Sequence, residues 1–202
     1  MALSFLSKRS PADPYLVKPI KTARFSLVNC NVRQAVKVTL PWRQDKEVLH
    51  NLMMRKDGYS QLEWVKAMGR PNGNTLFYHA IVSKEAGGTI GTHRVKLNRF
   101  GTASMAIVIH ARSWWGKDVF EEVRTGILDH FSASEKVERF YGRVLSRNFS
   151  SVYNYTKLGF RLIGYDRSAW RSPVTKEFCD TMHYEMLAED WIARQAKGAN
   201  DE

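Results

Sequence analysis

The stretch Asn148–Phe160, with the sequence NFSSVYNYTKLGF, contains a helix together with signals for both of its ends. The adjacent serines near its start favour a helix beginning there, because hydroxyl oxygens accept hydrogen bonds from the free N–H groups of a first turn. Gly159 favours a helix end, because glycine adopts the left-handed conformation without a steric penalty. Apolar segments of strand length lie on either side, at Val137–Leu145 and Phe160–Trp170. We therefore expect a strand, a helix and a strand in succession.

Three further segments of strand length precede this unit, and the turns between them contain glycine. They are Leu76–Ser83, Thr89–Leu97 and Ala103–Ile109. Their close spacing predicts an antiparallel meander. The next segment, Lys117–Phe131, repeats apolar residues with the period of an amphipathic helix. A meander that passes into a β-α-β unit predicts the α+β class, with a mixed α/β sheet and helices on its faces.

The two ends of the sequence are less regular than its middle. Three prolines interrupt residues 1–20, which we expect to be an irregular lead-in. We predict that residues 21–192 form a single domain and that residues 193–202 are a polar tail. Within the domain we predict a strand over Arg24–Val38, helices over Asp45–Met54 and Leu62–Met68, and a last strand over Thr181–Leu187.

The composition is that of an ordinary globular protein, with 202 residues, 44% of them hydrophobic and 25% charged. It has no apolar run of the length, about 18 residues, that spans a membrane. Met1–Leu6 has no basic segment before it and is followed at once by polar residues, so we predict no signal peptide. The two cysteines predict neither a disulfide framework nor a metal site, and they fit a reducing cytoplasm.

The formal net charge of +11 concerns partners rather than fold. One interpretation is a solvated basic surface. The other is attraction to anions, such as the phosphates of a coenzyme, an acidic substrate or nucleic acid. The basic residues are scattered and form no dense arm, which disfavours nucleic acid as the partner.

The junction between the strand Ala103–Ile109 and the helix Lys117–Phe131 is a candidate anion site. Gly116 lets the backbone approach a ligand closely. The free N–H groups and the positive dipole end of the first helical turn suit a pyrophosphate, and Lys117 adds positive charge. Such a junction is also a common way for a chain to reverse direction, so by itself it leaves both interpretations open.

The junction and the stretch Asn148–Phe160 together resemble the acyl-CoA site of the GNAT superfamily of N-acetyltransferases. Many members have the pattern W-G-K-G-hydrophobic-x-x-E-A in the first segment and N-x-x-S-hydrophobic-x-x-Y-x-K-L-G-F in the second. The residues that match the first pattern are Trp115, Gly116, Lys117 and Glu122, and those that match the second are Asn148, Ser151, Val152, Tyr155, Lys157, Leu158, Gly159 and Phe160. The combination looks most like the RimJ/RimL-type branch, which acetylates protein N-termini and small amines.

The resemblance implies a fold, a reaction and a site. The GNAT fold is a central, mostly antiparallel twisted sheet of six to seven strands, splayed at the acyl-CoA site. The reaction is direct transfer of an acetyl group from acetyl-CoA, with no metal, to a primary amine of a peptide or protein N-terminus or of a small molecule. A cytoplasmic location, no membrane partner and a homodimer are also expected. The implied acyl-CoA site comprises Ile107, Val108, Ile109, Trp115, Gly116, Lys117, Asp118, Val119, Asn148, Ser151 and Tyr155.

Tyr155 matches the residue that in this superfamily protonates the leaving thiolate as a general acid. The alternative is that Tyr155 is only a packing aromatic on an amphipathic helix. Tyr153 is two residues away and faces roughly the opposite side of the helix. The backbone N–H groups of Ile107–Ile109 are expected to bind the oxyanion.

The general base and the acceptor groove are less well defined by the sequence. His110 directly follows a strand beside the expected acyl site, and histidine suits proton transfer. The alternative is a hydrogen-bonded structural histidine. Glu122 is expected to be structural, and His93 and Glu177 are weaker candidates for the base. Trp170 ends a predicted strand, and Arg171 begins the loop Arg171–Asp180 that joins the last two strands. Both residues are candidates for lining the acceptor groove.

Two positions depart from the family's pyrophosphate loop, Q/R-x-x-G-x-G/A. Ser113 stands in place of Gln or Arg, and Asp118 stands in place of the second Gly or Ala. A carboxylate near phosphates is unfavourable. Three interpretations follow: Asp118 points outward and caps the helix, it weakens coenzyme binding, or the site is degenerate or takes another ligand. The competing functions are therefore a catalytically weakened acyl-CoA-binding protein of the same fold and a basic nucleic-acid-associated protein.

Overall fold

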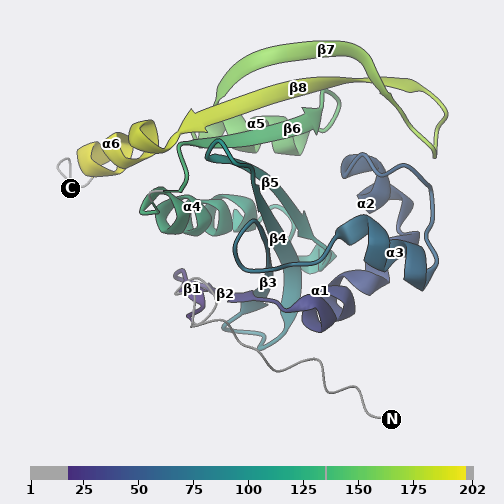
Figure 1. Cartoon of the computed structure of the whole chain (residues 1–202), viewed down its shortest axis with the longest axis horizontal. Helices are drawn as coiled ribbons and strands as arrows, with labels where there is room; N and C mark the ends of the chain where they lie inside the picture. Colours follow the sequence, from purple (N-terminus) through teal and green to yellow (C-terminus); the bar gives the residue numbers. More distant parts are fainter. Residues whose placement is uncertain (1–17, 135, 199–202) are drawn as a thin grey trace.

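The computed structural model describes residues 18–134 and 136–198, which contain a single eight-stranded sheet with the order β1-β2-β3-β4-β5-β6-β8-β7 (Figure 1). Neighbouring strands are antiparallel except β5 and β6, which are parallel. The strands are β1 (Ile20–Lys21), β2 (Phe25–Asn29), β3 (Leu76–Ser83), β4 (Thr89–Leu97), β5 (Thr102–Ile109), β6 (Arg139–Leu145), β7 (Arg161–Arg171) and β8 (Phe178–Leu187). The prediction of a mixed, mostly antiparallel sheet is confirmed.

The sheet has more strands than the six to seven expected, because β1 forms across the predicted boundary between the lead-in (residues 1–20) and the domain. This strand has only two residues. Two residues are too few to show an alternating pattern, and they take extended form because they pair with β2. Residues 1–17 of the predicted lead-in lie outside the described residues.

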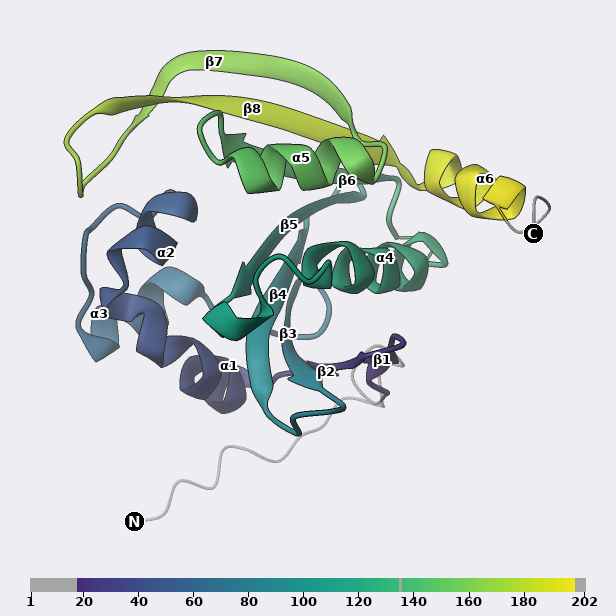
Figure 2. The ribbon, with the colours of Figure 1, turned by 180° about the vertical axis from the view of Figure 1, so that it is seen from behind.

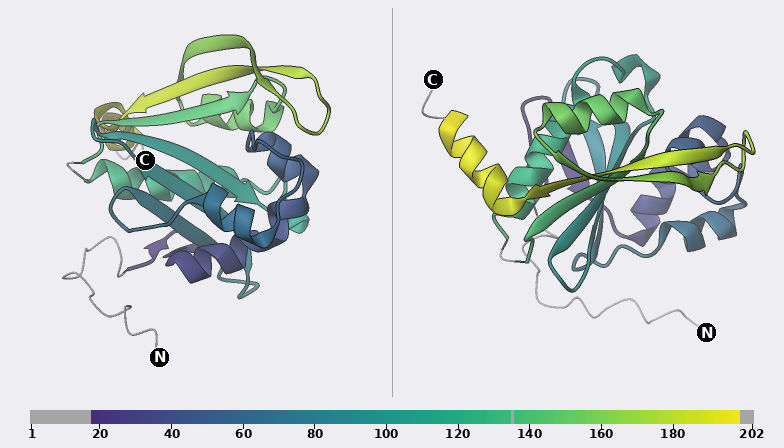
Figure 3. Two further views of the ribbon diagram at one scale, coloured as in Figure 1. Left: turned by 45° about the vertical axis from the view of Figure 1, so that its right-hand side comes forward. Right: turned by 90° about the horizontal axis from the view of Figure 1, so that it is seen from above.

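Helices cover both faces of the sheet, as expected. Figures 2 and 3 show α4 and α5 on one side, and α1, α2 and α3 on the other. The helices are α1 (Val32–Thr39), α2 (Lys46–Asn51), α3 (Gln61–Met68), α4 (Val119–Ser132), α5 (Phe149–Lys157) and α6 (Ala188–Gly198), with short 3-10 turns η2 (Leu40–Gln44) and η3 (Arg112–Trp114). None of the helices in the described part of the chain is long and apolar enough to cross a membrane.

The main core lies between the sheet and α4. The predicted amphipathic face of α4 is buried, with Val123, Ile127 and Leu128 fully inaccessible to solvent. Burial of each such side chain stabilises the fold by about 1.5–3 kcal/mol. This packing fixes the start of α4, and with it the junction Ile109–Val119, relative to β5.

The predicted strand Arg24–Val38 is wrong in its second half. The strand β2 ends at Asn29, and α1 begins at Val32 because Asn31 caps it. The Asn31 side chain accepts a hydrogen bond from the Gln34 backbone N–H (3.0 Å), and the Gln34 side chain accepts one from the Asn31 N–H (2.9 Å). This reciprocal capping box outweighs the polar alternation that favoured a strand.

The predicted polar tail begins inside a helix. Helix α6 extends to Gly198, so residues 193–198 are helical, and residues 199–202 lie outside the described residues. Trp191 is 2% exposed, and its indole N–H donates to Asp129 of α4 (2.8 Å). The polar outer face of α6 is consistent with the polar composition, but Trp191 fastens the helix to the domain.

The parallel strands β5 and β6 pair over a short distance and then diverge (Figure 1). Their register joins Thr102–Ser104 to Arg139–Tyr141. From Met105 to Ile109, β5 pairs with β4, and from Gly142 onward β6 pairs with β8. The sheet therefore opens between β5 and β6, with Ser104 and Tyr141 at the vertex.

Candidate active site

The free edge of β5 faces the opening between β5 and β6. Ile107, Val108 and Ile109 pair with β4 on one side, and the register with β6 ends before them. Buried backbone groups need hydrogen-bond partners. The β6-facing backbone groups of these residues are therefore placed to bond an extended ligand that enters the opening.

The junction after β5 folds back on the end of that strand. The indole N–H of Trp115 donates to the Ile109 carbonyl (2.8 Å), and the Arg112 guanidinium lies over the Trp115 ring at 4.8 Å. Gly116 has a φ of 71° and no atom within 4 Å of the position a Cβ would take. Its backbone is therefore open to a ligand at the start of α4, and the left-handed conformation favours glycine.

Asp118 also adopts the left-handed conformation, with φ of 53°, immediately before α4. Its side chain makes no capping hydrogen bond and is 74% exposed. It points toward Lys157 of α5, whose amino group lies 3.6 Å from the Asp118 carboxylate and 2.5 Å from that of Glu121. The hydrogen bond to Glu121 raises the pKa of Lys157. Of the three interpretations of Asp118, the first is therefore correct only in part: the carboxylate points outward, but at the N-cap position its side chain makes no capping bond.

The start of α5 shows which residue of the second motif caps the helix. Asn148 is the N-cap, and its side-chain oxygen accepts hydrogen bonds from the Ser151 N–H and the Ser150 hydroxyl, both at 3.2 Å. The sequence suggested that the serines would be the caps. Asn148 thus closes the turn between β6 and α5, and Ser151 is held beside it.

Tyr155 of α5 is 3% exposed and lies at the vertex of the opening. Its ring stacks on Tyr184 with centroids 5.2 Å apart, and it meets Phe160 edge-on at 5.0 Å. A Cβ atom at Gly142 would lie 2.2 Å from the Tyr155 hydroxyl oxygen. The ring therefore packs in the core, while the hydroxyl reaches β6 at the first residue beyond its pairing with β5.

A buried guanidinium lies beside Tyr155. Arg124 of α4 is 1% exposed, with its charged carbon 4.8 Å from the Phe120 ring centroid and 5.2 Å from that of Tyr155. Its Nε and Nη1 atoms have no hydrogen-bond partner among the described residues. Burial, and next the charge of Arg124, hold the pKa of His93 well below its ordinary value. His93 is also fully buried, which removes it as a base open to an acceptor.

The other candidates for the base differ in their surroundings. His110 is half-buried, its ring lies 5.7 Å from Trp42, and burial lowers its pKa, so the neutral form is favoured. Glu122 accepts hydrogen bonds from the Thr22 hydroxyl and the Arg24 backbone N–H, both at 2.6 Å. These bonds tie the β1–β2 turn to α4, which is a structural role. Glu177 pairs with Arg147 at 3.6 Å on the surface.

The end of β7 and the loop that follows it reach α2 on the side opposite α5. This loop spans residues 172–177 and is shorter than the predicted loop Arg171–Asp180, because Arg171 pairs with Phe178 at the end of the β7–β8 ladder. The Trp170 ring meets the His50 ring edge-on at 5.3 Å, and His50 Nδ1 lies 3.0 Å from the Ser172 hydroxyl. Arg171 instead donates to the Lys176 carbonyl of its own loop (3.0 Å). Of the two predicted acceptor residues, the structure therefore brings Trp170 toward α2 but not Arg171.

Sequence reasoning missed Tyr141, Asp166 and His183, which form a hydrogen-bonded cluster across β6, β8 and β7. An Asp and a His on adjoining strands of a hairpin were the only signal. The hairpin register shifts between Leu162 and Gly164 and again between Asp166 and Trp170, so simple pairing would not have aligned them.

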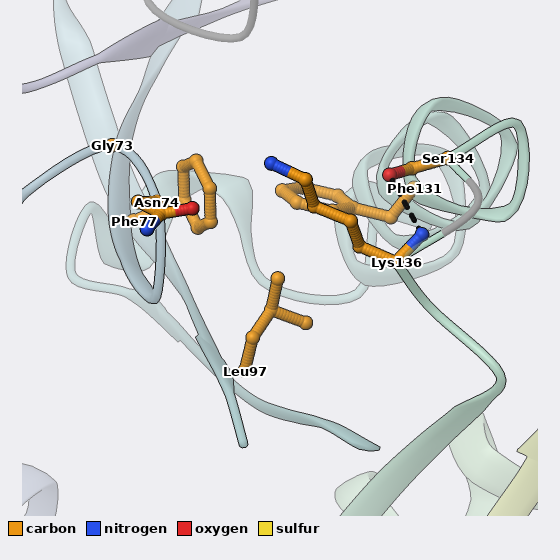
Figure 4. Close-up of a pocket in the computed structure, with 7 residues that line it drawn as sticks. All are labelled: Gly73, Asn74, Phe77, Leu97, Phe131, Ser134 and Lys136. Atoms are coloured by element: carbon orange, nitrogen blue, oxygen red, sulfur yellow. Dashed lines mark hydrogen bonds between the residues drawn. The ribbon is translucent and has the colours of Figure 1, made fainter. Parts of the chain in front are cut away.

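A narrow pocket, shown in Figure 4, lies at the far end of α4, and it has no space that a water molecule could occupy. It is lined by Phe77, Leu97, Phe131 and neighbouring residues, and the Lys136 N–H donates to the Ser134 hydroxyl within it (3.3 Å). Because α4 has 14 residues, this pocket lies about 20 Å from the junction at Gly116. Among the described residues there is no group of three or more His, Cys, Asp or Glu side chains that could hold a metal ion.

The comparisons with known proteins agree with this geometry. Similar solved structures include a spermidine N-acetyltransferase from Vibrio cholerae in complex with CoA and spermine (TM-score 0.72, 16% identity, covering 84% of this chain and 99% of that one). They also include a ribosomal-protein-S5-alanine acetyltransferase from Vibrio fischeri (TM-score 0.66, 16% identity, 85% and 97%). A third, from Salmonella typhimurium, modifies the N-terminal serine of ribosomal protein L7/L12 (TM-score 0.67, 13% identity, 84% and 97%).

At these identities the solved structures show a shared fold. No curated protein matches the sequence. The family model of the acetyltransferase (GNAT) domain, in contrast, matches residues 24–161, which is more than half of the chain. The chain therefore belongs to the GNAT acetyltransferase family.

Proposed function

We propose that the protein transfers an acetyl group from acetyl-CoA to a primary amine, as in the RimJ/RimL-like branch. The observation that carries the proposal is the opening between β5 and β6, with the Tyr155 hydroxyl at its vertex against Gly142. An acyl thioester that lies along the free edge of β5 would have its carbonyl beside backbone N–H donors and its sulfur near a phenol.

The residues of the site fit each part of the coenzyme. The start of the 14-residue helix α4, with Gly116 open and Lys117 beside it, suits the pyrophosphate. The N–H groups of Ile107–Ile109 would stabilise the oxyanion, where loss of a single donor costs about 10²–10³ in kcat. Tyr155 would give its proton to the leaving sulfur. The amine attacks in its neutral form, so a proton acceptor is needed on the acceptor side.

The comparisons support an amine as the acceptor class, and the structure indicates the side from which it would approach. One of the similar structures above modifies the N-terminal serine of a ribosomal protein, another is a ribosomal-protein-S5-alanine acetyltransferase, and the third was solved with the polyamine spermine. The loop between β7 and β8 (residues 172–177) and helix α2 lie on the side away from α5, and Trp170 of β7 and His50 of α2 meet there. An acceptor on this side would reach the thioester from the face opposite the coenzyme.

The test is acetyl-CoA binding by calorimetry, followed by thiol release with a panel of N-terminal peptides and polyamines. We expect micromolar binding by the wild type, weaker binding by Asn148→Ala, and unchanged binding with slow turnover by Tyr155→Phe. Failure of the wild type to bind acetyl-CoA would contradict the proposal.

A second function is favoured by one specific observation, the Asp118 and Glu121 carboxylates beside the start of α4. Repulsion between these groups and phosphates supports an acyl-CoA-binding protein with weakened catalysis. Saturable acetyl-CoA binding without thiol release across the whole amine panel would identify this function.

The homodimer expected from the sequence is also a proposal. Strand β7 is an edge of the sheet, and Leu162, Ile163 and Tyr165 on it are 48%, 42% and 51% exposed. Exposed apolar edge strands favour pairing with another chain. Light scattering that gives the mass of a single chain at micromolar concentration would contradict the dimer.

A further inference from the structure

Three side chains from neighbouring strands form a hydrogen-bonded cluster on the face of the sheet opposite α5. The Tyr141 hydroxyl of β6 bonds to Nδ1 of His183 on β8. His183 Nε2 lies 2.7 Å from the Asp166 carboxylate of β7. The sheet order β6-β8-β7 places the three strands side by side, so the contacts join residues that are up to 42 positions apart in the sequence.

The chemistry of the partners fixes where the protons lie. The Asp166 carboxylate can only accept a hydrogen bond, so His183 Nε2 carries a proton and donates it. When the ring carries a single proton, on Nε2, Nδ1 is a lone-pair acceptor and the Tyr141 O–H can donate to it. The Tyr141 oxygen keeps its own lone pairs free to accept a proton from another donor.

The cluster lies at the vertex of the opening, where β5 and β6 stop pairing. Tyr141 is the β6 residue that pairs with Ser104, the last position at which β5 and β6 are joined. The next residue, Gly142, faces Tyr155 on the α5 side. Because successive strand residues point to opposite faces, Tyr141 points to the other side of the sheet. Tyr155 and Tyr141 therefore lie on opposite faces of the sheet, both next to the position where β5 and β6 stop pairing.

The other carboxylate near Tyr141 is already paired with arginines, so His183 remains the proton acceptor for Tyr141. The carboxylate of Glu185 lies two residues further along β8 on the same face, and it is bound by Arg139 (3.3 Å) and by Arg161. Burial, the largest influence, raises the pKa of Tyr141. The phenol thus keeps its proton unless it can pass it on to His183.

We propose that Tyr141, His183 and Asp166 form a relay that removes the proton from the attacking amine. The inference rests on the proposed acetyl transfer and adds the proton acceptor that the sequence did not identify. It differs from the sequence-based choice of His110, which packs on Trp42 and whose Nδ1 has no partner among the described residues.

The step balances in atoms and charge. The bond between the amine nitrogen and the acetyl carbon forms, and the carbon–sulfur bond breaks with its electron pair on sulfur, which takes a proton from Tyr155. The proton of the amine moves to the Tyr141 oxygen while the Tyr141 proton moves to His183 Nδ1. The resulting imidazolium is stabilised by Asp166, which is 57% exposed, and it returns its proton to water. The Tyr155 phenolate takes a proton back from water, so both groups regain their starting state and no net proton is gained or lost.

The experiment compares Tyr141→Phe and His183→Gln with the wild type in acetyl-CoA-dependent thiol release and acetyl-CoA binding. General acid–base groups contribute about 10²–10⁴-fold, so we expect each variant to lose at least about 100-fold in kcat. The dissociation constant of acetyl-CoA should change by less than about 2-fold, because the relay lies on the other face. The double variant should be no slower than the slower single variant, since both changes interrupt one path.

Two controls separate catalysis from structure. Tyr165→Phe likewise removes one tyrosine hydroxyl that is bonded to a β8 side chain, here the Asp180 carboxylate, and should retain wild-type kcat. Added imidazole should restore part of the activity of His183→Ala, which a purely structural defect would not allow. Should His183→Ala fail to fold, Tyr141→Phe gives the answer alone, because it removes one oxygen atom and keeps the ring.

The outcomes distinguish this inference from the proposed function. An active wild type whose Tyr141→Phe and His183→Gln variants keep kcat within about 3-fold would overturn the relay and leave acetyl transfer intact. A wild type that releases no thiol with any amine would overturn both.

Discussion

The hydroxyl oxygen of Tyr155 lies against Gly142, where β5 and β6 stop pairing. A Cβ atom at residue 142 would lie 2.2 Å from this oxygen and 2.3 Å from the ring carbon that bears it. The phenol therefore reaches the opening only because residue 142 has no side chain. Helix α5 and strand β6 come together at this contact, so the position of the hydroxyl depends on a residue outside the motif that contains Tyr155.

We predict that Gly142→Ala displaces the Tyr155 ring and slows turnover. Overpacking of this kind costs about 1–3 kcal/mol of stability, and a misplaced general acid costs at least about 100-fold in kcat. Steady-state kinetics and thermal unfolding check both effects. The control is Gly88→Ala, where the nearest atom to the new Cβ is 3.9 Å away. Equal kcat for Gly142→Ala and the wild type would mean that the Tyr155 hydroxyl does not act in the reaction.

We predict that removing the Asp118 charge tightens acetyl-CoA binding. The Asp118 carboxylate lies beside the start of α4 and competes for Lys157, but it is 74% exposed. Exposed charge interactions are worth about 0.2–1 kcal/mol, so Asp118→Asn should lower the dissociation constant by about 1.5- to 5-fold. The effect should shrink at high salt.

A second substitution of Asp118 separates the effect of its backbone conformation on stability from the effect of its charge on coenzyme binding. Asp118→Gly also relieves the left-handed backbone, where φ is 53°. It should therefore raise the melting temperature more than Asp118→Asn does. Calorimetry at two salt concentrations checks the charge effect, and weaker binding by Asp118→Asn would show that this carboxylate helps to hold the coenzyme.

We predict that Asn148 has two roles that a second cap can separate. Its side chain caps α5, as Asn31 caps α1. Loss of an N-cap costs about 0.5–2 kcal/mol, so Asn148→Ala and Asn31→Ala should both lower the free energy of unfolding by this amount. Only Asn148→Ala should weaken acetyl-CoA binding. Parallel denaturant titrations and calorimetry test this, and equal binding by the two variants would leave Asn148 with a capping role alone.

The sequence predicted those parts of the structure that depend on neighbouring residues, and it did not predict contacts between residues far apart in the chain. The strand–helix–strand around Asn148–Phe160 and the amphipathic α4 were predictable, because their caps and periods are local. The strand β1 and the split of Arg24–Val38 into β2 and α1 were not, because a two-residue strand has no period and the Asn31 cap was overlooked. The contact of Tyr155 with Gly142 was invisible because it depends on how α5 packs on β6.

We predict that the protein loses stability as pH falls from about 6.5 toward 3, in part through His79. Burial lowers the pKa of His79 from 6.5 to about 3. In this window the unfolded chain binds a proton at His79 and the folded chain does not, so acid favours unfolding. Above pH 6.5 the ring is neutral in both states and the contribution is complete.

The size of the His79 effect is set by one proton. A difference of one proton gives a slope of up to about 1.4 kcal/mol per pH unit. His79→Asn, although less stable at neutral pH, should therefore have a shallower fall in unfolding free energy between pH 6 and 4. Urea titrations at several pH values measure both slopes, and parallel slopes would show that His79 accepts a proton in the folded state.

The two predicted acceptor residues should respond differently to substitution. Trp170 meets His50 of α2 edge-on at 5.3 Å, whereas Arg171 is bonded to the Lys176 carbonyl of its own loop. We therefore predict that Trp170→Ala raises KM for the amine by at least about 10-fold, the factor that follows from losing about 1.4 kcal/mol of aromatic contact. Arg171→Ala should leave this KM within about 2-fold, since exposed polar contacts of this kind contribute little. Neither change should alter the dissociation constant of acetyl-CoA, because both residues lie at the end of β7, which β6 and β8 separate from β5 in the sheet. Kinetics with the amine varied at saturating acetyl-CoA separate the two constants. A larger effect from Arg171→Ala than from Trp170→Ala would place the acceptor along the outer side of the β7–β8 hairpin instead of between the hairpin and α2.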